Sequence, residues 1–308
     1  MSWSPEQIPS LAGTTAVVTG SNSGIGLVTA TELARHGAHV VLACRKVDVA
    51  EQAAESIRTA DADADVRVAA LDLASLQSVE AFADSWSGPL DLLVNNAGVM
   101  MPRSWRATAD GFELQFGTNH LGHFALTGRL LPALLAASSP RVVTVASLAH
   151  RQGIADVLQG NPQARYQPQR AYGNSKLANL LFGAELQRRA ERHAPRLTST
   201  VAHPGVTATN LFTSPDGMGA SRVVRTLGPV AMKVLLQSAS AGANPTLYAA
   251  TEAEPGSYTG PSWLGEMRGP VGSARRSALG RDEALAAALW ERSEELTGVR
   301  FPWPVRTP

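Results

Sequence analysis

Short apolar runs alternate with amphipathic segments along most of this chain. From residue 15 onward the runs are mostly rich in β-branched residues, and the segments between them carry apolar residues at helical spacing. Short apolar runs of this kind are typical of strands that are buried on both faces of a sheet. The expected strands cover residues 15–19, 39–43, 66–70, 91–94, 141–146 and 197–202.

The segments between the runs predict helices, so strands and helices alternate along the chain. This order favours right-handed crossovers and a parallel sheet with helices on both faces. We therefore expect an α/β fold, a doubly wound parallel sheet of the Rossmann type with about seven strands, in a single domain over residues 1–308. Within this domain, residues 205–308 are expected to supply the substrate cleft and the carboxyl-terminal elements. The expected helices cover residues 24–36, 48–60, 75–86, 110–137, 171–193 and 282–298.

Less regular segments lie in the second half of the chain. Residues 161–170 are polar and predict a loop, and residues 212–221 predict a second loop that contains glycine. An apolar helix is expected directly after it, at residues 222–237. We interpret this helix as a lid over the substrate cleft. A subunit interface and a contact with lipid are the alternatives.

Composition narrows the class of protein. The net charge of +1, without a long run of one sign, excludes the basic footprint of a nucleic-acid or membrane-surface protein. No run approaches the ~18 apolar residues of a membrane span, and no signal peptide is visible, so we expect a cytoplasmic protein. The single cysteine, Cys44, rules out an internal disulfide and a cysteine-based zinc site. Trp263, Trp290 and Trp303 are expected to pack in the carboxyl-terminal third.

A glycine-rich turn, "VVTGSNSGIG", joins the first expected strand to the first expected helix. Gly20, Gly24 and Gly26 would let the backbone turn sharply and approach a diphosphate, and the helix amino terminus would offer unpaired N–H groups. The spacing G-x-x-x-G-x-G differs from the commoner dinucleotide fingerprint. A plain loop is the alternative, but the position at the first strand–helix junction favours a nucleotide site.

Arg45 follows the second expected strand, at a place where many dinucleotide sites have an acidic residue that binds the ribose hydroxyls. A carboxylate would repel a 2′-phosphate, whereas a guanidinium can bind it with two donors. The sequence therefore favours NADP(H) over NAD(H). The alternative is that Arg45 only begins a solvated helix.

Tyr172 and Lys176 are four residues apart in an expected helix, so their side chains share one face. A free tyrosine has a pKa of ~10, and lowering it to roughly 7–8 corresponds to about 3–4 kcal/mol. A nearby ammonium in a partly dry cleft stabilises the phenolate by about this amount. The pair is therefore a candidate for proton transfer, with Tyr172 as general acid/base and Lys176 lowering its pKa.

Several motifs occur together in one order along the chain. They are "TGSNSGIG" (19–26), "NNAG" (95–98), Asn119, Ser147, "YGNSK" (172–176) and "HPG" (203–205). With these motifs the chain resembles the short-chain dehydrogenase/reductase family over roughly residues 12–260. The sequences of residues 118–127 and 173–182 are most similar to the branch of retinol dehydrogenases, WW-domain oxidoreductases and protochlorophyllide reductases.

The resemblance implies roles for the catalytic candidates Asn119, Ser147, Tyr172 and Lys176. Ser147 would hydrogen-bond the substrate oxygen, and Lys176 would also hold the nicotinamide ribose. In the family, the residue that corresponds to Asn119 kinks its helix and holds a water through its backbone carbonyl, which gives the lysine a proton path to solvent. Either Ser147 or Asn119 alone would be read as structural.

The resemblance also implies a set of cofactor contacts. Asp72 and Leu73 would meet the adenine, and the segment after the fourth strand would lie along its ribose. Residues after the sixth strand would meet the nicotinamide carboxamide, and Thr209, less favourably Thr207, would bond the carboxamide or the diphosphate. The full expected set is Gly20, Ser21, Asn22, Ser23, Gly24, Ile25, Gly26, Arg45, Asp72, Leu73, Asn96, Ala97, Gly98, Tyr172, Lys176, Pro204, Gly205, Val206 and Thr209.

His120 and His123 are three residues apart, but no neighbouring carboxylate completes a helical metal motif, so we expect no metal. The family reaction needs none, because the cofactor carries the hydride.

The resulting hypothesis is an NADP(H)-dependent oxidoreductase that acts on the carbonyl or alcohol of a lipophilic small molecule. One alternative is reduction of a conjugated C=C bond, and another is a catalytically silent NADP(H)-binding regulatory protein. By resemblance, a homodimer or homotetramer would pair through the helices at 110–137 and 171–193.

Overall fold

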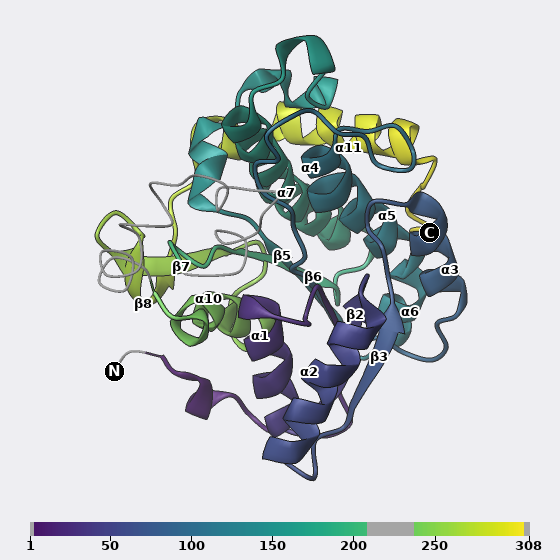
Figure 1. Cartoon of the computed structure of the whole chain (residues 1–308), viewed down its shortest axis with the longest axis vertical. Helices are drawn as coiled ribbons and strands as arrows, with labels where there is room; N and C mark the ends of the chain where they lie inside the picture. Colours follow the sequence, from purple (N-terminus) through teal and green to yellow (C-terminus); the bar gives the residue numbers. More distant parts are fainter. Residues whose placement is uncertain (1–2, 208–236, 305–308) are drawn as a thin grey trace.

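The computed structural model describes residues 3–207 and 237–304 (Figure 1). Three expectations therefore lie wholly or almost wholly outside the described residues: the contact of Thr209, the loop at 212–221 and the apolar helix at 222–237. The described elements form one sheet with helices on both of its faces, as expected for a doubly wound fold.

The sheet has eight strands in the order β3–β2–β1–β4–β5–β6–β7–β8. The first seven are parallel to their neighbours, and β8 runs antiparallel to β7. The first six coincide with the expected strands to within a residue or two. The strands are β1 Thr15–Thr19, β2 His39–Cys44, β3 Val66–Ala70, β4 Leu92–Asn95, β5 Arg141–Val145, β6 Thr198–Ala202, β7 Tyr258–Trp263 and β8 Arg268–Ser273.

The hairpin β7–β8 contributes two strands that the sequence did not place, so the sheet has eight strands where about seven were expected. Its two strands read "YTGPSW" and "RGPVGS", which contain glycine and proline instead of an apolar run. Both residue types are poor strand formers, and proline is tolerated at an edge because it has no N–H to donate. The pattern is therefore hard to recognise without the neighbouring strand.

Two hydrophobic cores lie on opposite faces of the sheet. Alternate residues of β1 point to each, with Ala16 and Val18 in the core beneath α1, α2 and α10, and Val17 in the core beneath α3, α5, α7 and α11. The helices are α1 Gly24–Arg35, α2 Val47–Ala60, α3 Leu76–Asp84, α4 Leu114–Phe116, α5 Gly122–Arg129, α6 Leu131–Ala136, α7 Pro168–His193, α10 Ala239–Thr251 and α11 Glu283–Thr297. Short 3-10 helices are η1 Pro5–Gln7, η3 Leu148–Gln152, η4 Ala155–Gln159, η5 Gln163–Arg165 and η7 Leu279–Arg281.

The helix expected at 110–137 is divided into pieces. A π-helical turn, η2 Gly117–Leu121, separates α4 from α5, and Pro132 lies at the start of α6. The helix α10 was not expected at all, because its sequence has few large apolar residues at helical spacing and contains both Gly242 and Pro245. Its fit depends on small residues: a Cβ on Gly242 would lie 2.5 Å from the Thr207 hydroxyl oxygen.

The carboxyl-terminal helix α11 covers a face of α5 and α7. Trp290 of α11 is 1% exposed and lies with its ring edge-on to Phe124 of α5 and nearly parallel to Phe182 of α7. Pairing of two chains through α5 and α7 would therefore have to use another face of these helices. Trp303 also packs here, but Trp263 is 62% exposed, so its expected burial is wrong.

His120 links the π-helical turn to α11. Its Nε2 lies 2.8 Å from the Ser293 hydroxyl oxygen, and its ring packs against Phe116, Phe124 and Phe182. The side chain is buried, and this burial lowers the pKa of His120 to about 3 from an ordinary value of 6.5. The imidazole is therefore neutral in the folded protein near neutral pH.

A neutral buried histidine makes the fold sensitive to acid. The unfolded chain binds a proton near pH 6.5 and the folded one only near pH 3, so this contribution to stability is full above pH 6.5 and is lost as pH falls below it. His120→Phe lacks this titrating group. We therefore expect its unfolding free energy to fall less steeply than that of wild type below pH 6, by up to ~1.4 kcal/mol per pH unit. Urea unfolding at several pH values measures this, with the exposed His193→Phe as control. Parallel curves for wild type and His120→Phe would contradict the assignment.

Candidate active site

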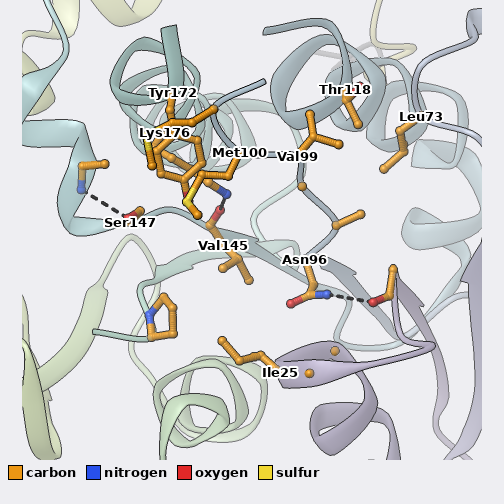
Figure 2. Close-up of a pocket in the computed structure, with 18 of the residues that line it drawn as sticks. Ile25, Leu73, Asn96, Val99, Met100, Thr118, Val145, Ser147, Tyr172 and Lys176 are labelled. Carbon is orange, nitrogen blue, oxygen red and sulfur yellow. Dashed lines mark hydrogen bonds between the residues drawn. The ribbon is translucent and has the colours of Figure 1, made fainter. Parts of the chain in front are cut away.

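One large cavity lies at the carboxyl-terminal edge of the sheet, where parallel sheets bind ligands (Figure 2). Its volume is about 1040 Å³. It is lined by residues that come one or two positions after each of the first six strands, namely Gly20, Arg45, Asp72, Asn96, Ser147 and Pro204. The fold thus brings together motifs that are far apart in the sequence.

The glycine turn between β1 and α1 has no room for side chains. Gly20 has a φ of +63°, and a Cβ there would lie 2.8 Å from the Cβ of Ala97. A Cβ on Gly26 would lie 2.4 Å from Nδ2 of Asn96 and 2.6 Å from the carbonyl oxygen of Gly20. The N–H groups in the first turn of α1 have no intrahelical acceptor, as at the start of any helix. The Ser23 side chain does not cap them either, and this end of α1 borders the cavity. This arrangement fits a bound diphosphate.

Ser21 is the one residue of the expected glycine-turn set that does not line the cavity. It is fully buried, and its hydroxyl donates to the carbonyl oxygen of Val18 at 2.8 Å and contacts the Cys44 sulfur at 3.7 Å. Burial raises the pKa of the Cys44 thiol. Ser21 therefore shapes the turn from behind.

Two basic side chains, Arg45 and Lys46, border the cavity beyond β2, and both are exposed. The buried Cys44 occupies the end of the strand, where a carboxylate would otherwise bind ribose hydroxyls. The local charge is therefore positive. Only Arg45 of this pair was expected from the sequence to take part.

The segments that follow β3 and β4 form part of the cavity wall, and hydrogen bonds hold them in place. The Asp72 carboxylate accepts from the N–H of Ala74 at 3.0 Å. The hydroxyl oxygen of Thr19 accepts from the N–H groups of Asn96 and Ala97, both at 2.9 Å. Leu73 and Gly98 line the cavity as well, so all of the expected residues from these two segments border it.

Tyr172 and Lys176 both line the cavity from the first half of α7. The Lys176 ammonium is buried, lies 5.9 Å from the centre of the Tyr172 ring and donates to the backbone carbonyl of Val145 at 3.0 Å. Burial lowers the pKa of Lys176 to about 8. The same carbonyl accepts from the side chain of Asn179 at 3.1 Å, so α7 is bonded to the last residue of β5.

The pKa of the Tyr172 phenol moves in the opposite direction to the sequence expectation. Burial raises it to about 12, and only a hydrogen bond from the neighbouring Ser147 opposes this rise. Lys176 points its ammonium at Val145, so its charge does not outweigh the desolvation of the phenol. The side chains of this chain therefore hold Tyr172 in its protonated form.

Ser147 follows β5 and caps the short helix η3, where its hydroxyl oxygen accepts from the N–H of Ala149 at 3.2 Å. It borders the same cavity as Tyr172 and Lys176. Three of the four catalytic candidates thus meet at one wall, and Figure 2 shows them with Met100 and Val145.

The fourth candidate, Asn119, lies in the π-helical turn behind the cavity and does not line it. Its side chain binds both backbone groups of Val99, with distances of 2.7 Å and 3.0 Å. Its carbonyl oxygen, to which the family resemblance assigns a water, lies 2.9 Å from Nδ1 of His123. The helix is therefore distorted at Asn119, as the resemblance implies, but Asn119 acts on the cavity wall through Val99.

The segment after β6 lines the cavity through Pro204, Gly205 and Val206. Gly205 has a φ of +69°, and a Cβ there would lie 2.4 Å from the carbonyl oxygen of Met267 in the β7–β8 turn. Thr207, the less favoured of the two threonines, also lines the cavity, and its hydroxyl donates to the Pro204 carbonyl at 3.0 Å.

Most of one wall of the cavity was missed by the sequence analysis. It is formed mainly by the segment directly after the "NNAG" motif, whose apolar reading "VMMP" was the available signal. No spacing rule connects this segment with the residues that face it across the cavity. The wall contains the apolar residues Val99, Met100, Met101, Pro102, Leu114 and Leu148 and the polar residues Arg106, Gln152 and Gln169.

A buried carboxylate supports this wall of the cavity. Glu113 is 2% exposed, accepts from the N–H groups of Gln115 and Phe116 at 2.9 Å, and accepts from the Asn161 side chain at 3.0 Å. Burial raises the pKa of Glu113. The Gln115 side chain in turn accepts from the N–H of Met101 at 2.7 Å, so the wall is fixed from behind.

Within residues 3–207 and 237–304, no group of three or more histidine, cysteine, aspartate or glutamate side chains is arranged to hold a metal ion. His123 instead contacts the carbonyl of Asn119 and the Thr19 hydroxyl. None of the helices in the same ranges is both long and apolar enough to cross a membrane.

Known proteins resemble this chain over most of its length. Residues 14–216 match the family described as short chain dehydrogenase. Human retinol dehydrogenase 13 is 40% identical over 297 residues, which are 95% of this chain and 87% of that protein. A crystal structure of an uncharacterized protein from Mycobacterium paratuberculosis has a TM-score of 0.82 at 43% identity and covers 98% of this chain and 100% of that one. L-Sorbose reductase from Gluconobacter frateurii, crystallised with NADPH and L-sorbose, has a TM-score of 0.64 at 25% identity and covers 80% of this chain and 94% of that one.

The tight glycine turn makes a direct prediction. In Gly26→Ala the new methyl group would overlap Asn96 and Gly20, so we expect a loss of ~1–3 kcal/mol of unfolding free energy and weaker nucleotide binding. Gly272→Ala is the control, because a Cβ there would meet only Ser262 at an ordinary 3.4 Å. Denaturant unfolding and NADPH titration of both variants measure the effect. If both variants behaved alike, the turn would have room for a methyl group at Gly26, contrary to the structure.

Proposed function

Because the chain belongs to the short-chain dehydrogenase/reductase family, in the branch of the retinol dehydrogenases, we propose that it is an NADP(H)-dependent oxidoreductase that interconverts the alcohol and carbonyl forms of a lipophilic small molecule. The observation that carries this proposal is the shared cavity. It joins the glycine turn, with its uncapped helix terminus, to Ser147, Tyr172 and Lys176 at the other end.

The proton chemistry belongs to Tyr172 and its neighbours. The Ser147 hydroxyl binds the substrate oxygen, and the Tyr172 phenol donates its proton to that oxygen during reduction. Because burial keeps this phenol protonated, it is ready to act as the acid. Lys176 is held by Val145 beside the ring, where its ammonium stabilises the phenolate that forms. In the family, the bound nicotinamide supplies the hydride.

The residues along the cavity fit a nicotinamide dinucleotide with a 2′-phosphate. The glycine turn and the start of α1 would hold the diphosphate, and Asp72 and Leu73 would hold the adenine. Arg45 would bind the 2′-phosphate, and Lys46 beside it adds a second positive charge. L-Sorbose reductase, a structural relative, was crystallised with NADPH, which supports this choice of cofactor. Asn96, Ala97, Gly98 and the 204–206 segment would complete the site.

The cavity wall that follows the "NNAG" motif, which we assign to the substrate, suits a lipophilic molecule. This wall is mainly apolar, with methionine, leucine, valine and proline side chains, and its polar groups are few. Apolar walls with a small number of polar groups suit ligands whose binding comes from buried surface. The name of the human relative, retinol dehydrogenase 13, points to the same class of alcohol. We therefore propose long-chain or polyene aldehydes and alcohols as the first compounds to assay.

Removal of the Tyr172 hydroxyl tests the proton donor. We expect Tyr172→Phe to lower kcat by ~10²–10⁴ while NADPH binding is retained. Tyr248→Phe removes the same atom from a tyrosine that does not line the cavity, so its kcat should equal that of wild type. Nicotinamide absorbance with a panel of lipophilic aldehydes, ketones and enones gives the rates, and product analysis separates carbonyl from C=C reduction. An unchanged kcat in Tyr172→Phe would rule out its role.

Charge reversal at Arg45 tests the cofactor. A carboxylate there would repel the 2′-phosphate, so we expect Arg45→Asp to lower the NADPH/NADH ratio of kcat/KM by at least ~10-fold, which is ~1.4 kcal/mol. Arg196→Asp makes the same change of charge just before β6, at the opposite edge of the sheet, and should leave the ratio as it is. If both variants keep the wild-type ratio, Arg45 does not select the cofactor.

A further inference from the structure

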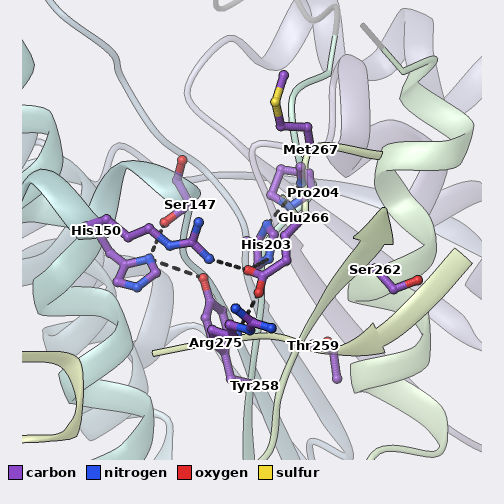
Figure 3. A network of polar contacts seen from close by, with 12 residues as sticks. Ser147, His150, His203, Pro204, Tyr258, Thr259, Ser262, Glu266, Met267 and Arg275 are labelled. Carbon is purple, nitrogen blue, oxygen red and sulfur yellow. Dashed lines mark hydrogen bonds and ion pairs between the residues drawn. The ribbon is translucent and has the colours of Figure 1, made fainter. Parts of the chain in front are cut away.

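A polar network, buried except for the partly exposed Arg151, lies behind the cavity, between the segment that follows β5 and the segment that follows β6 (Figure 3). The first segment carries Ser147, and the second carries Pro204 and Gly205. The turn of the β7–β8 hairpin reaches both through Glu266. None of the network residues discussed below, His150, Arg151, His203 and Glu266, lines the cavity itself.

His150 is hydrogen-bonded to the backbone of Ser147. Its Nδ1 lies 2.7 Å from the carbonyl oxygen of Ser147, and its Nε2 lies 3.2 Å from the N–H of Ser277. A carbonyl only accepts and an N–H only donates, so the hydrogen of this imidazole is on Nδ1. The ring is fully buried, and burial lowers the pKa of His150. His150 is therefore a neutral connector that holds the Ser147 segment.

His203 makes the corresponding link on the other segment. Its Nδ1 accepts from the N–H of Gly205 at 3.2 Å, so its hydrogen is on Nε2. That nitrogen is fully buried and lies 3.5 Å from a carboxylate oxygen of Glu266, its one charged neighbour within ion-pair distance in the part of the chain that the structure describes. The ring is tightly packed, since a Cβ on Gly260 would approach Nε2 to 2.0 Å.

Glu266 is the residue that both segments share. One of its oxygens accepts from Arg151 of η3 at 2.6 Å, and the other accepts from the N–H of Arg275 at 3.1 Å. Its side chain is 10% exposed although it lies in a hairpin turn, and its φ is +71°. A residue other than glycine keeps this conformation only where the surroundings impose it. The next residue, Met267, accepts from the N–H of Val206 at 2.9 Å.

We propose that Glu266 is a positioning residue, which sets the Ser147 segment and the Pro204–Val206 segment relative to each other through Arg151 and His203. The inference rests on the proposed function, in which Ser147 holds the substrate oxygen and the 204–206 segment holds the nicotinamide carboxamide. These two groups fix the reacting atoms of the two bound molecules. A small displacement between them would slow the reaction, because transfer depends steeply on alignment.

The first test measures the link without any ligand. In Glu266→Gln the side chain keeps its size but loses its charge, so we expect amide hydrogen exchange to become at least ~5-fold faster in both residues 147–153 and residues 203–207. Asp156→Asn, which breaks the exposed ion pair with Arg165, is the control and should leave both segments as in wild type. Faster exchange in only one segment, or in neither, would overturn the proposal.

The second test compares two ligands that differ in the nicotinamide. We expect Glu266→Gln to raise the dissociation constant of NADPH at least ~10-fold and that of 2′-phospho-ADP-ribose less than ~2-fold. A general loss of structure would weaken both ligands equally, and that result would overturn the positioning role. If wild type binds NADPH no better than 2′-phospho-ADP-ribose, the proposed function fails, and the exchange experiment still decides whether Glu266 links the segments.

A second variant covers the case in which Glu266→Gln does not fold. Arg151→Met keeps the contacts of Glu266 with His203 and Arg275 and removes only the link to η3. Faster exchange confined to residues 147–153, with a lower kcat and an unchanged dissociation constant for NADPH, supports the proposal. Unchanged exchange in that segment contradicts it.

Discussion

The backbone carbonyl of Val145 accepts two side-chain hydrogen bonds from α7, at 3.0 Å from Lys176 and 3.1 Å from Asn179. Val145 ends β5 and Ser147 follows two residues later, while Tyr172 lies one helical turn before Lys176. This contact therefore sets the distance between the serine hydroxyl and the phenol. Burial of an ammonium opposes folding, and the lowered pKa of Lys176 is the visible consequence. Packing of α7 against β5, β6 and α11 offsets this cost.

The two halves of the cavity are shaped by different parts of the chain: closely packed backbone in one half and side chains in the other. At the proposed cofactor half, backbone atoms pack so closely that glycine is required, as at Gly20 and Gly26. At the proposed substrate half, flexible apolar side chains such as Met100 and Met101 form the surface, and the buried Glu113 fixes the backbone behind them. Backbone packing tolerates little change, whereas side chains on a supported loop can be replaced. Substrate preference can therefore vary while the proposed cofactor site stays the same.

The last third of the chain completes the site from outside. The hairpin β7–β8 extends the sheet and places Glu266 between two loops of the cavity. The helix α10 packs against α1 through small buried residues such as Ala243, and α11 covers α5 and α7. These elements carry none of the family motifs. Their effect on the site passes through contacts, such as the one between Arg151 and Glu266, that join residues 115 positions apart.

The sequence by itself determined the first six strands, the glycine turn and the pairing of Tyr172 with Lys176, because each depends on residues that are close in the chain. Apolar runs, glycine spacing and a separation of four residues on a helix are local properties. Only the tertiary structure decided the rest. It added β7, β8 and α10, and it exposed Trp263. It also raised the pKa of Tyr172, because burial and the direction of a neighbouring ammonium depend on packing between distant segments.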